Sequence, residues 1–151
     1  MLRMQRRVAL LGCPTPDGFR IDRYDPVEHH EAIPILYSQS FGDDPWRADW
    51  DSLEEFDPRG AFVAGRVESP SMCGFALSFR RADFGYISVV GVVPEYRRPG
   101  IASALVGSAV DYLGSLGLDL VRIDAWEDAP AAVAAYRSLG FEIYERRLET
   151  D

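Results

Sequence analysis

Apolar and polar positions along the chain predict strands first, and alternating helices and strands afterwards. Residues 19–24 alternate apolar and charged side chains, which is typical of a half-buried strand. Apolar runs at 61–67 and 73–79, joined by the turn-forming residues 68–71, predict two more strands. Residues 86–93 have the strongest strand propensity in the chain, because they are rich in β-branched side chains.

Two aspartate–proline pairs mark helix starts between the first strand and the second. The pairs at 25–26 and 44–45 each supply an N-cap followed by proline at the first helical position. The first helix runs towards residue 37 and meets Pro34, which should kink or split it, because proline lacks an N–H and clashes with the preceding turn. The second helix is expected to have one apolar face, formed by Trp46, Trp50 and Leu53.

Helices and strands alternate from residue 101 onwards. Apolar residues at helical spacing predict a helix over 101–116 and a second one over 129–139. A strand follows each helix, at 118–125 and 141–148. Helices between strands imply crossover connections and partly parallel pairing, so the fold class is α/β or α+β.

Length and cysteine content favour a single domain without a metal. The 151 residues fit one core, which we place at 19–151, with 1–18 as an N-terminal arm or an extra strand. Cys13 and Cys73 are too few for a disulfide framework, and neither has a cysteine or histidine at metal-ligand spacing. We therefore expect a reducing, cytoplasmic environment and no bound metal.

Charge and hydropathy argue against two classes of partner. The net charge of −8 disfavours a nucleic-acid binder, which needs a basic stripe along the phosphates. The longest apolar run falls far short of the roughly 20 residues that cross a membrane. The basic residues 1–7 and the apolar run 8–13 imitate a signal peptide, but the run is shorter than such signals require. We interpret this start as a strand or an arm.

The segment 89–102 combines a buried strand, a turn with two arginines and a glycine at a helix start. Unpaired amides at a helix start and the positive end of its dipole favour an anion such as phosphate. Gly100 would let the backbone approach closely, and Arg97 and Arg98 would add charge. Pro99 has no N–H to donate. A plain strand-to-helix turn with solvated arginines is the other interpretation of these residues alone.

Two motifs together resemble the GNAT superfamily of N-acetyltransferases. The segment 97–102 matches that family's acetyl-CoA motif, R/Q-x-x-G-x-G/A, at Arg97, Gly100 and Ala102. The segment 136–141, Tyr-Arg-Ser-Leu-Gly-Phe, is similar to the family's second signature. The motifs stand in the family's order and separation, over a resemblance that covers about residues 19–141. It implies a mixed, mostly antiparallel sheet that splays at a central parallel strand pair, with helices on both faces.

The resemblance implies a site for acetyl-CoA as cosubstrate. The strand ending near Val93 would diverge from the strand ending near Ala125, with Gly91 as the β-bulge that starts the divergence. Backbone groups of Val90, Gly91 and Val92 would pair with the pantetheine amides. The N–H of Val92 would polarise the thioester carbonyl. The pyrophosphate would lie among Arg97, Arg98, Gly100, Ile101, Ala102 and Ser103.

The resemblance also implies direct attack of a neutral amine on the acetyl carbon. Tyr136 stands at the family's acid position and would protonate the departing CoA thiolate; a core tyrosine is the other interpretation. Asp124 is our first candidate for the general base, acting through water, and Glu127 at the strand end is the second. For each carboxylate, a solvated or salt-bridged side chain is the alternative. The adjacent His29 and His30 are expected to face solvent rather than to act in catalysis.

The chain departs from the family pattern in two places. Ala129 stands where relatives often have an asparagine that contacts the cofactor, and Asp128 would cap the next helix instead. The family usually has two strands after Leu-Gly-Phe, whereas residues 141–151 leave room for one. We hypothesise that residues 4–11 supply the missing strand or a contact in a homodimer.

The acceptor is constrained mainly by the acidic segment 43–57. It carries seven acids and one base, a local net charge of −6, and it is interleaved or flanked by Phe41, Trp46, Trp50 and Phe56. One interpretation is an acidic, aromatic-edged mouth for a cationic amine such as a polyamine, an aminoglycoside or a peptide amine. A solvated helix face with its aromatics in the core is the other.

The leading hypothesis for function is an acetyl-CoA-dependent N-acetyltransferase that works by direct transfer in a ternary complex. The first alternative is a GNAT-fold module that binds CoA or a protein partner without catalysis, which the missing asparagine favours. The second is a structural protein whose cleft is blocked by Trp126 or Arg98.

Overall fold

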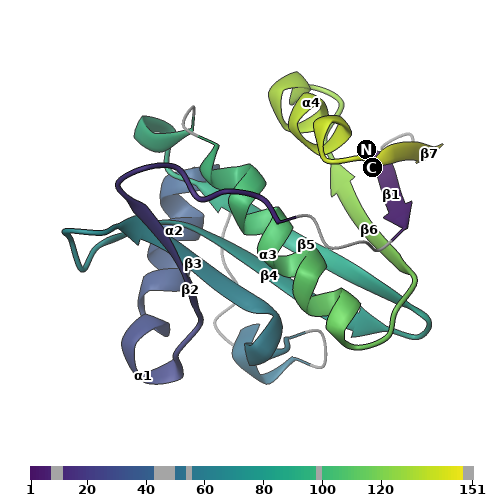
Figure 1. The fold of residues 1–151 in the computed structure, drawn as a ribbon. Helices are drawn as coiled ribbons and strands as arrows, with labels where there is room; N and C mark the ends of the chain where they lie inside the picture. The colour runs from purple at the N-terminus through teal and green to yellow at the C-terminus, as the bar shows by residue number, and fades with distance from the viewer. Residues whose placement is uncertain (8–11, 43–49, 54–55, 98–99, 148–151) are drawn as a thin grey trace.

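The described strands form one seven-stranded sheet, in the order β2-β3-β4-β5-β6-β1-β7 (Figure 1). The computed structural model describes residues 1–7, 12–42, 50–53, 56–97 and 100–147. Its strands are β1 (Leu2–Arg7), β2 (Phe19–Arg23), β3 (Ala61–Arg66), β4 (Met72–Arg81), β5 (Phe84–Val92), β6 (Leu120–Ala125) and β7 (Glu142–Arg146).

Among the described strands, β5 and β6 form the one parallel pair, and all other neighbours pair antiparallel. Parallel neighbours need a crossover connection, which here is the helix α3 (Ile101–Ser115). The fold class predicted from the sequence, a mostly antiparallel sheet with a central parallel pair, is confirmed.

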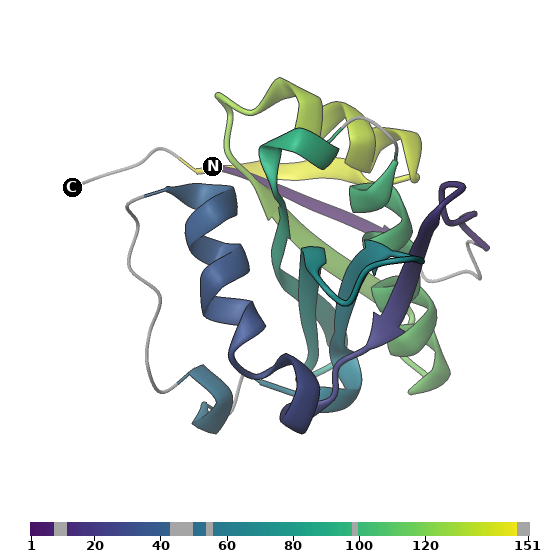
Figure 2. The ribbon, with the colours of Figure 1, turned by 90° about the vertical axis from the view of Figure 1, so that its left-hand side faces the viewer.

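Helices cover both faces of the sheet (Figure 2). The helices α1 (Pro26–His29) and α2 (Ala32–Phe41) lie on one face, and α3 lies on the other, where α4 (Pro130–Ser138) contacts it. Short 3-10 helices occur at η1 (Trp50–Ser52), η2 (Pro58–Gly60) and η3 (Pro94–Tyr96). The core between sheet and helices includes the fully buried side chains of Phe75, Ile87, Leu105 and Leu113.

The helix signals before the second strand are confirmed where the structure describes them. Asp25 caps α1 by accepting the N–H of Val27 at 2.8 Å. Pro34 lies in the first turn of α2, and the chain separates into α1 and α2 just before it, as its missing N–H predicts. The helix start expected at 44–45 lies outside the described residues.

The N-terminal segment occupies an internal position in the sheet. β1 pairs antiparallel with β6 on one side and with β7 on the other. Met4 is fully buried in the core, and the N–H of Arg147 donates to the carbonyl of Met1 at 2.9 Å. Of the residues 4–11 that we hypothesised to supply a strand, 4–7 lie in β1 and 8–11 lie outside the described part.

Candidate active site

A cleft opens between β5 and β6 because their pairing is short. The register joins Gly85 to Val121, Tyr86 to Arg122 and Ile87 to Ile123, and it stops there. On the other side of β5, Ile87 pairs with Ser78 and Val89 with Leu77, so Ser88 is an extra residue, a β-bulge. We predicted this bulge at Gly91, and that prediction is wrong, because Gly91 pairs regularly with Phe75.

The bulge reverses the faces to which later residues of β5 point. A Cβ on Gly85 would lie 2.8 Å from Leu113 of α3, whereas a Cβ on Gly91 would lie 3.0 Å from Ser40 of α2. Residues six apart in a regular strand share a face, so the additional residue at Ser88 accounts for the change. Both α2 and β4 leave no room for a side chain at Gly91, because its Cβ would also lie 2.7 Å from the ring of Phe75 on β4.

The edge of β5 beyond the bulge has backbone groups that face the cleft. The N–H of Val93 donates to the carbonyl of Cys73 on β4 at 2.9 Å. Amides alternate in direction along a strand, so the N–H groups of Val92 and Val90 face away from β4, towards the diverging β6. The Val92 carbonyl on this edge accepts the Nε of Arg97 at 2.9 Å.

The start of α3 lies at the end of this edge. Gly100 is its N-cap, with φ of +89°, in the left-handed region that favours glycine. The N–H of Ala104 bonds to the carbonyl of Gly100, so the amides of the first turn, including Ala102 and Ser103, have no helical acceptor. Ile101, with 0% of its surface exposed, anchors this helix start in the core.

Of the two arginines in the motif, Arg97 lies within the described residues. Arg97 directs its guanidinium at backbone carbonyls, with Nη2 on Ser40 at 2.8 Å and Nε on Val92. Its charge therefore joins α2 to β5 rather than pointing at the helix start. Arg98, together with Pro99, lies outside the described residues.

The predicted acid, Tyr136, lies on α4 and is buried with 7% of its surface exposed. Burial raises the pKa of Tyr136 to about 12. Its ring meets that of Phe141 edge-on, with centroids 6.2 Å apart. Among the described residues its hydroxyl has no hydrogen-bond partner, so the geometry leaves both the acid and the core interpretation open.

The two candidate bases lie in different surroundings. Asp124 accepts the hydroxyl of Tyr86 on Oδ2 at 2.5 Å, and its Oδ1 lies 3.6 Å from the Nε of Arg3 on β1. Glu127 lies beyond β6 and is largely exposed, 3.7 Å from Arg146. Sequence reasoning missed Tyr86 and Arg3, because their contacts depend on the registers of β5 and β1 against β6.

One histidine prediction is wrong and the other is confirmed. His29 is 6% exposed, and its Nδ1 accepts the N–H of Asp25 at 2.8 Å, so it is a buried structural residue. His30 is exposed, stacks on Trp50 and lies 3.4 Å from a carboxylate oxygen of Asp51.

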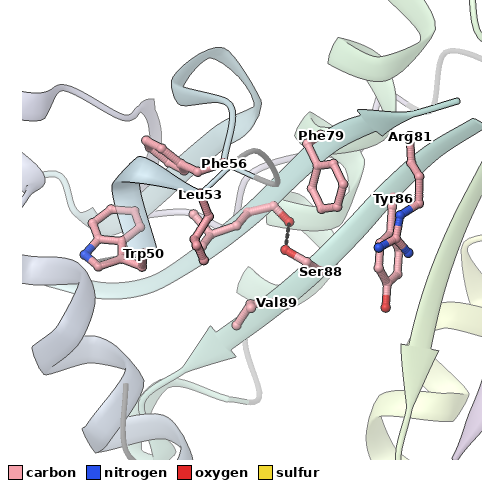
Figure 3. A pocket seen from close by; sticks show the side chains of 9 residues that line it. Trp50, Leu53, Phe56, Phe79, Arg81, Tyr86, Ser88 and Val89 are labelled. Atoms are coloured by element: carbon pink, nitrogen blue, oxygen red, sulfur yellow. Dashed lines mark hydrogen bonds between the residues drawn. The ribbon is translucent and has the colours of Figure 1, made fainter. Parts of the chain in front are cut away.

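A pocket of about 210 Å³ lies over β4 and β5, on the face of the sheet that α2 covers (Figure 3). Trp50, Leu53 and Phe56 form one wall, and the side chains of β4 and β5 form the other. The strand side consists of Leu77, Phe79, Arg81, Tyr86, Ser88 and Val89.

The acidic segment contributes aromatic rather than acidic side chains to the described wall. Asp57 accepts the hydroxyl of Tyr112 and the N–H of Arg59, and Asp51 pairs with His30; neither lines the pocket. Its five other acids, and Trp46, lie outside the described residues. Of the aromatics, Trp50 is 4% exposed and belongs to the core, as the second interpretation expected, while one side of it faces the pocket.

No described helix is long and apolar enough to cross a membrane. No group of three or more His, Cys, Asp or Glu among the described residues could hold a metal ion.

The sequence matches the family described as "Acetyltransferase (GNAT) family" over residues 27–141. A mycothiol acetyltransferase of Thermobispora bispora is 34% identical over 142 residues, which cover 83% of this chain and 47% of that protein. The chain thus spans about half the length of the curated relatives it matches.

Solved structures share the fold. A GCN5-related N-acetyltransferase from Sphaerobacter thermophilus superposes with a TM-score of 0.81 at 22% identity, over 95% of this chain and 48% of that one. An aminoglycoside N-acetyltransferase in complex with CoA superposes with a TM-score of 0.70 at 19% identity, over 91% of this chain and 98% of that one.

Proposed function

We propose that this chain, which belongs to the acetyltransferase (GNAT) family, moves an acetyl group from acetyl-CoA to a primary amine by direct attack in a ternary complex. The observation that carries the proposal is the divergence of β5 from β6 directly before the start of α3. An extended ligand can pair with the edge of β5 and place its phosphates at the helix start.

The donor would bind along β5 and end at α3. Val90, Gly91 and Val92 would offer backbone groups to the pantetheine, and the turn and helix start would hold the pyrophosphate. For the latter we propose Arg97, Arg98, Gly100, Ile101, Ala102 and Ser103, with Arg97 acting through its backbone because its side chain is engaged. The free amides and the φ of Gly100 fit an anion. CoA in the structure of a related fold supports this donor.

Catalysis would need three groups around the acetyl carbon. The N–H of Val92 would stabilise the developing oxyanion. Asp124, with Glu127 as the second candidate, would take the proton that the amine must lose before it attacks. Tyr136 would protonate the CoA thiolate; its pKa of about 12 means that the phenol carries its proton at neutral pH.

The pocket over β4 and β5, which reaches Tyr86 beside the cleft, would receive the acceptor. Its aromatic walls suit an amine with an apolar part. Cationic character of the acceptor, which the acidic segment suggested, stays a prediction. The cytoplasmic location, the homodimer and the domain boundary at residue 19 also stay predictions.

A non-catalytic module that binds CoA or a protein partner is the second candidate. The burial of Tyr136 favours it, since a core tyrosine would leave the thiolate without its acid. The structural alternative has less support, because Trp126 is 52% exposed at the end of β6.

A thiol-release screen separates these functions. Purified protein is given acetyl-CoA and a panel of amines sorted by charge, and free CoA thiol is measured. We expect amine-dependent release, and we expect Tyr136→Phe to lower kcat far more than it weakens CoA binding. Thermal stabilisation by CoA without turnover on any amine would favour the binding module.

A further inference from the structure

We propose that Tyr86 is a catalytic residue of this reaction, which passes the proton of the bound acceptor amine to Asp124. The inference rests on the proposed acetyl transfer and names a residue that the sequence did not indicate. It follows from the position of Tyr86, from its bond to Asp124 and from the pocket that it lines.

Tyr86 and Asp124 meet where the two strands separate. Ile87 and Ile123 are the last paired residues, so Asp124 is the first residue of β6 inside the cleft. Tyr86 pairs with Arg122, one position earlier, and its side chain reaches forward to the carboxylate of Asp124. The hydroxyl therefore lies level with Ser88, on the face of the sheet that holds the pocket. Val92 lies four residues, roughly 13 Å, further along β5, so this relay acts on an acetyl carbonyl held by the nearer cleft-facing N–H, that of Val90.

The contact is arranged for a proton to move from tyrosine to aspartate. The Tyr86 hydroxyl donates to Oδ2 of Asp124 at 2.5 Å. Burial, followed by the hydrogen bond to this carboxylate, raises the pKa of Tyr86, so the phenol keeps its proton at neutral pH. Oδ1 of Asp124 is buried without a hydrogen-bond partner and lies 3.6 Å from Arg3, which holds the carboxylate in place.

Tyr86, unlike Asp124, lines the pocket that would receive the amine. A phenol can accept a proton on its oxygen while it releases its own, so it can bridge a bound ammonium and a carboxylate that does not line the pocket. Figure 3 shows Tyr86 beside Arg81 on the strand side of this pocket.

The step balances in protons and charge. The bound ammonium gives one N–H proton to the oxygen of Tyr86 as the phenolic proton moves to Oδ2 of Asp124. The amine, now neutral, is free to attack the acetyl carbon, and Asp124 later returns its proton to water. The electron pair of the N–H bond becomes the lone pair of the nucleophile.

Charged and titratable groups from four strands surround this pair. β1 contributes Arg3, β4 contributes Arg81 and β6 contributes Arg122. β7 contributes Tyr144 and Glu145, which face Arg3. The three arginines disfavour a further positive charge beside this pair. An acceptor ammonium bound there is therefore favoured to lose its proton.

The test compares Tyr86→Phe with Tyr112→Phe in the thiol-release assay. Tyr112 on α3 donates to Asp57 in a bond of the same kind, so it controls for the loss of a Tyr–Asp contact. With an acceptor whose amine has a pKa of about 9, only about 1% of the amine is neutral at about pH 7, so we expect Tyr86→Phe to lower kcat there roughly 100-fold. At about pH 9.5 most of the acceptor is already neutral, so the deficit should shrink to about threefold or less.

The KM for acetyl-CoA should stay within about twofold, and Tyr112→Phe should keep kcat within about threefold at both pH values. A Tyr86→Phe deficit that is equal at both pH values, or as small as that of Tyr112→Phe, would overturn the inference. If Tyr86→Phe does not fold, Tyr86→Gln, which keeps a hydrogen-bond donor for Asp124 but has no hydroxyl to relay a proton, is judged by the same pH dependence. A wild-type protein without turnover on any amine would instead overturn the proposed function.

Discussion

Replacing Gly100 with alanine tests whether the start of α3 binds the phosphates of CoA. Gly100 has φ of +89°, and the atom nearest to a Cβ added there is Cγ of Pro16, at 3.8 Å. The substitution therefore meets no steric obstacle, and its cost is conformational, about 1–2 kcal/mol for an L-residue in the left-handed region. For a domain of 151 residues this lowers Tm by about 2–8 °C.

A glycine at the other end of α3 has the same conformational cost of substitution but lies away from the proposed phosphate site. Gly117 follows α3 with φ of +80°, and nothing lies within 4 Å of its added Cβ. Gly117→Ala is thus a matched control with an equal expected loss of stability.

CoA affinity should distinguish the two variants. Strain at residue 100 would displace the first turn of α3. One charge-assisted hydrogen bond from an amide of that turn to a phosphate of CoA, worth about 1.5–3 kcal/mol, would then be weakened. We expect CoA to bind roughly 10- to 100-fold more weakly to Gly100→Ala and with unchanged affinity to Gly117→Ala, measured by isothermal calorimetry. Equal CoA affinity in both variants would refute the reasoning.

Two further predictions concern packing and alkaline stability. Gly91→Ala should cost about 1–3 kcal/mol in the free energy of unfolding, because its Cβ would lie 2.7 Å from Phe75 of β4 and 3.0 Å from Ser40 of α2. A denaturant midpoint equal to that of the wild type would contradict this close packing around Gly91. Tyr136 has a folded pKa of about 12 against about 10 when unfolded, so its contribution to stability is complete below pH 10 and is lost as the pH rises towards 12, at about 1.4 kcal/mol per pH unit. Tyr136→Phe should remove that part of the alkaline slope of the unfolding free energy, and an unchanged slope would mean that this phenol titrates normally.

Local sequence signals were sufficient for the elements around the cleft. The run predicted at 86–93 and the helix predicted to start at residue 101 correspond to β5 and α3, because β-branched content and helical apolar spacing act over short distances. The strand at 118–125 was also predicted, and β6 forms its last six residues.

Features that depend on strand register or tertiary packing could not be predicted from the sequence. The bulge lies at Ser88 rather than Gly91 because its position depends on how β5 pairs with β4. The bond between Tyr86 and Asp124 joins residues 38 positions apart and requires the parallel register of β5 and β6. His29 was expected in solvent because its burial comes from tertiary packing that a four-residue helix does not reveal.

Backbone hydrogen exchange measured by NMR, with and without CoA, tests the central claim most directly. The amides of Val90 and Val92 face the open edge of β5, whereas those of Gly91 and Val93 face β4. Binding of CoA along that edge should slow exchange at Val90 and Val92 and leave Gly91 and Val93, which β4 already protects, unchanged. Saturating CoA that leaves exchange at Val90 and Val92 unaltered would show that the ligand does not occupy the cleft between β5 and β6.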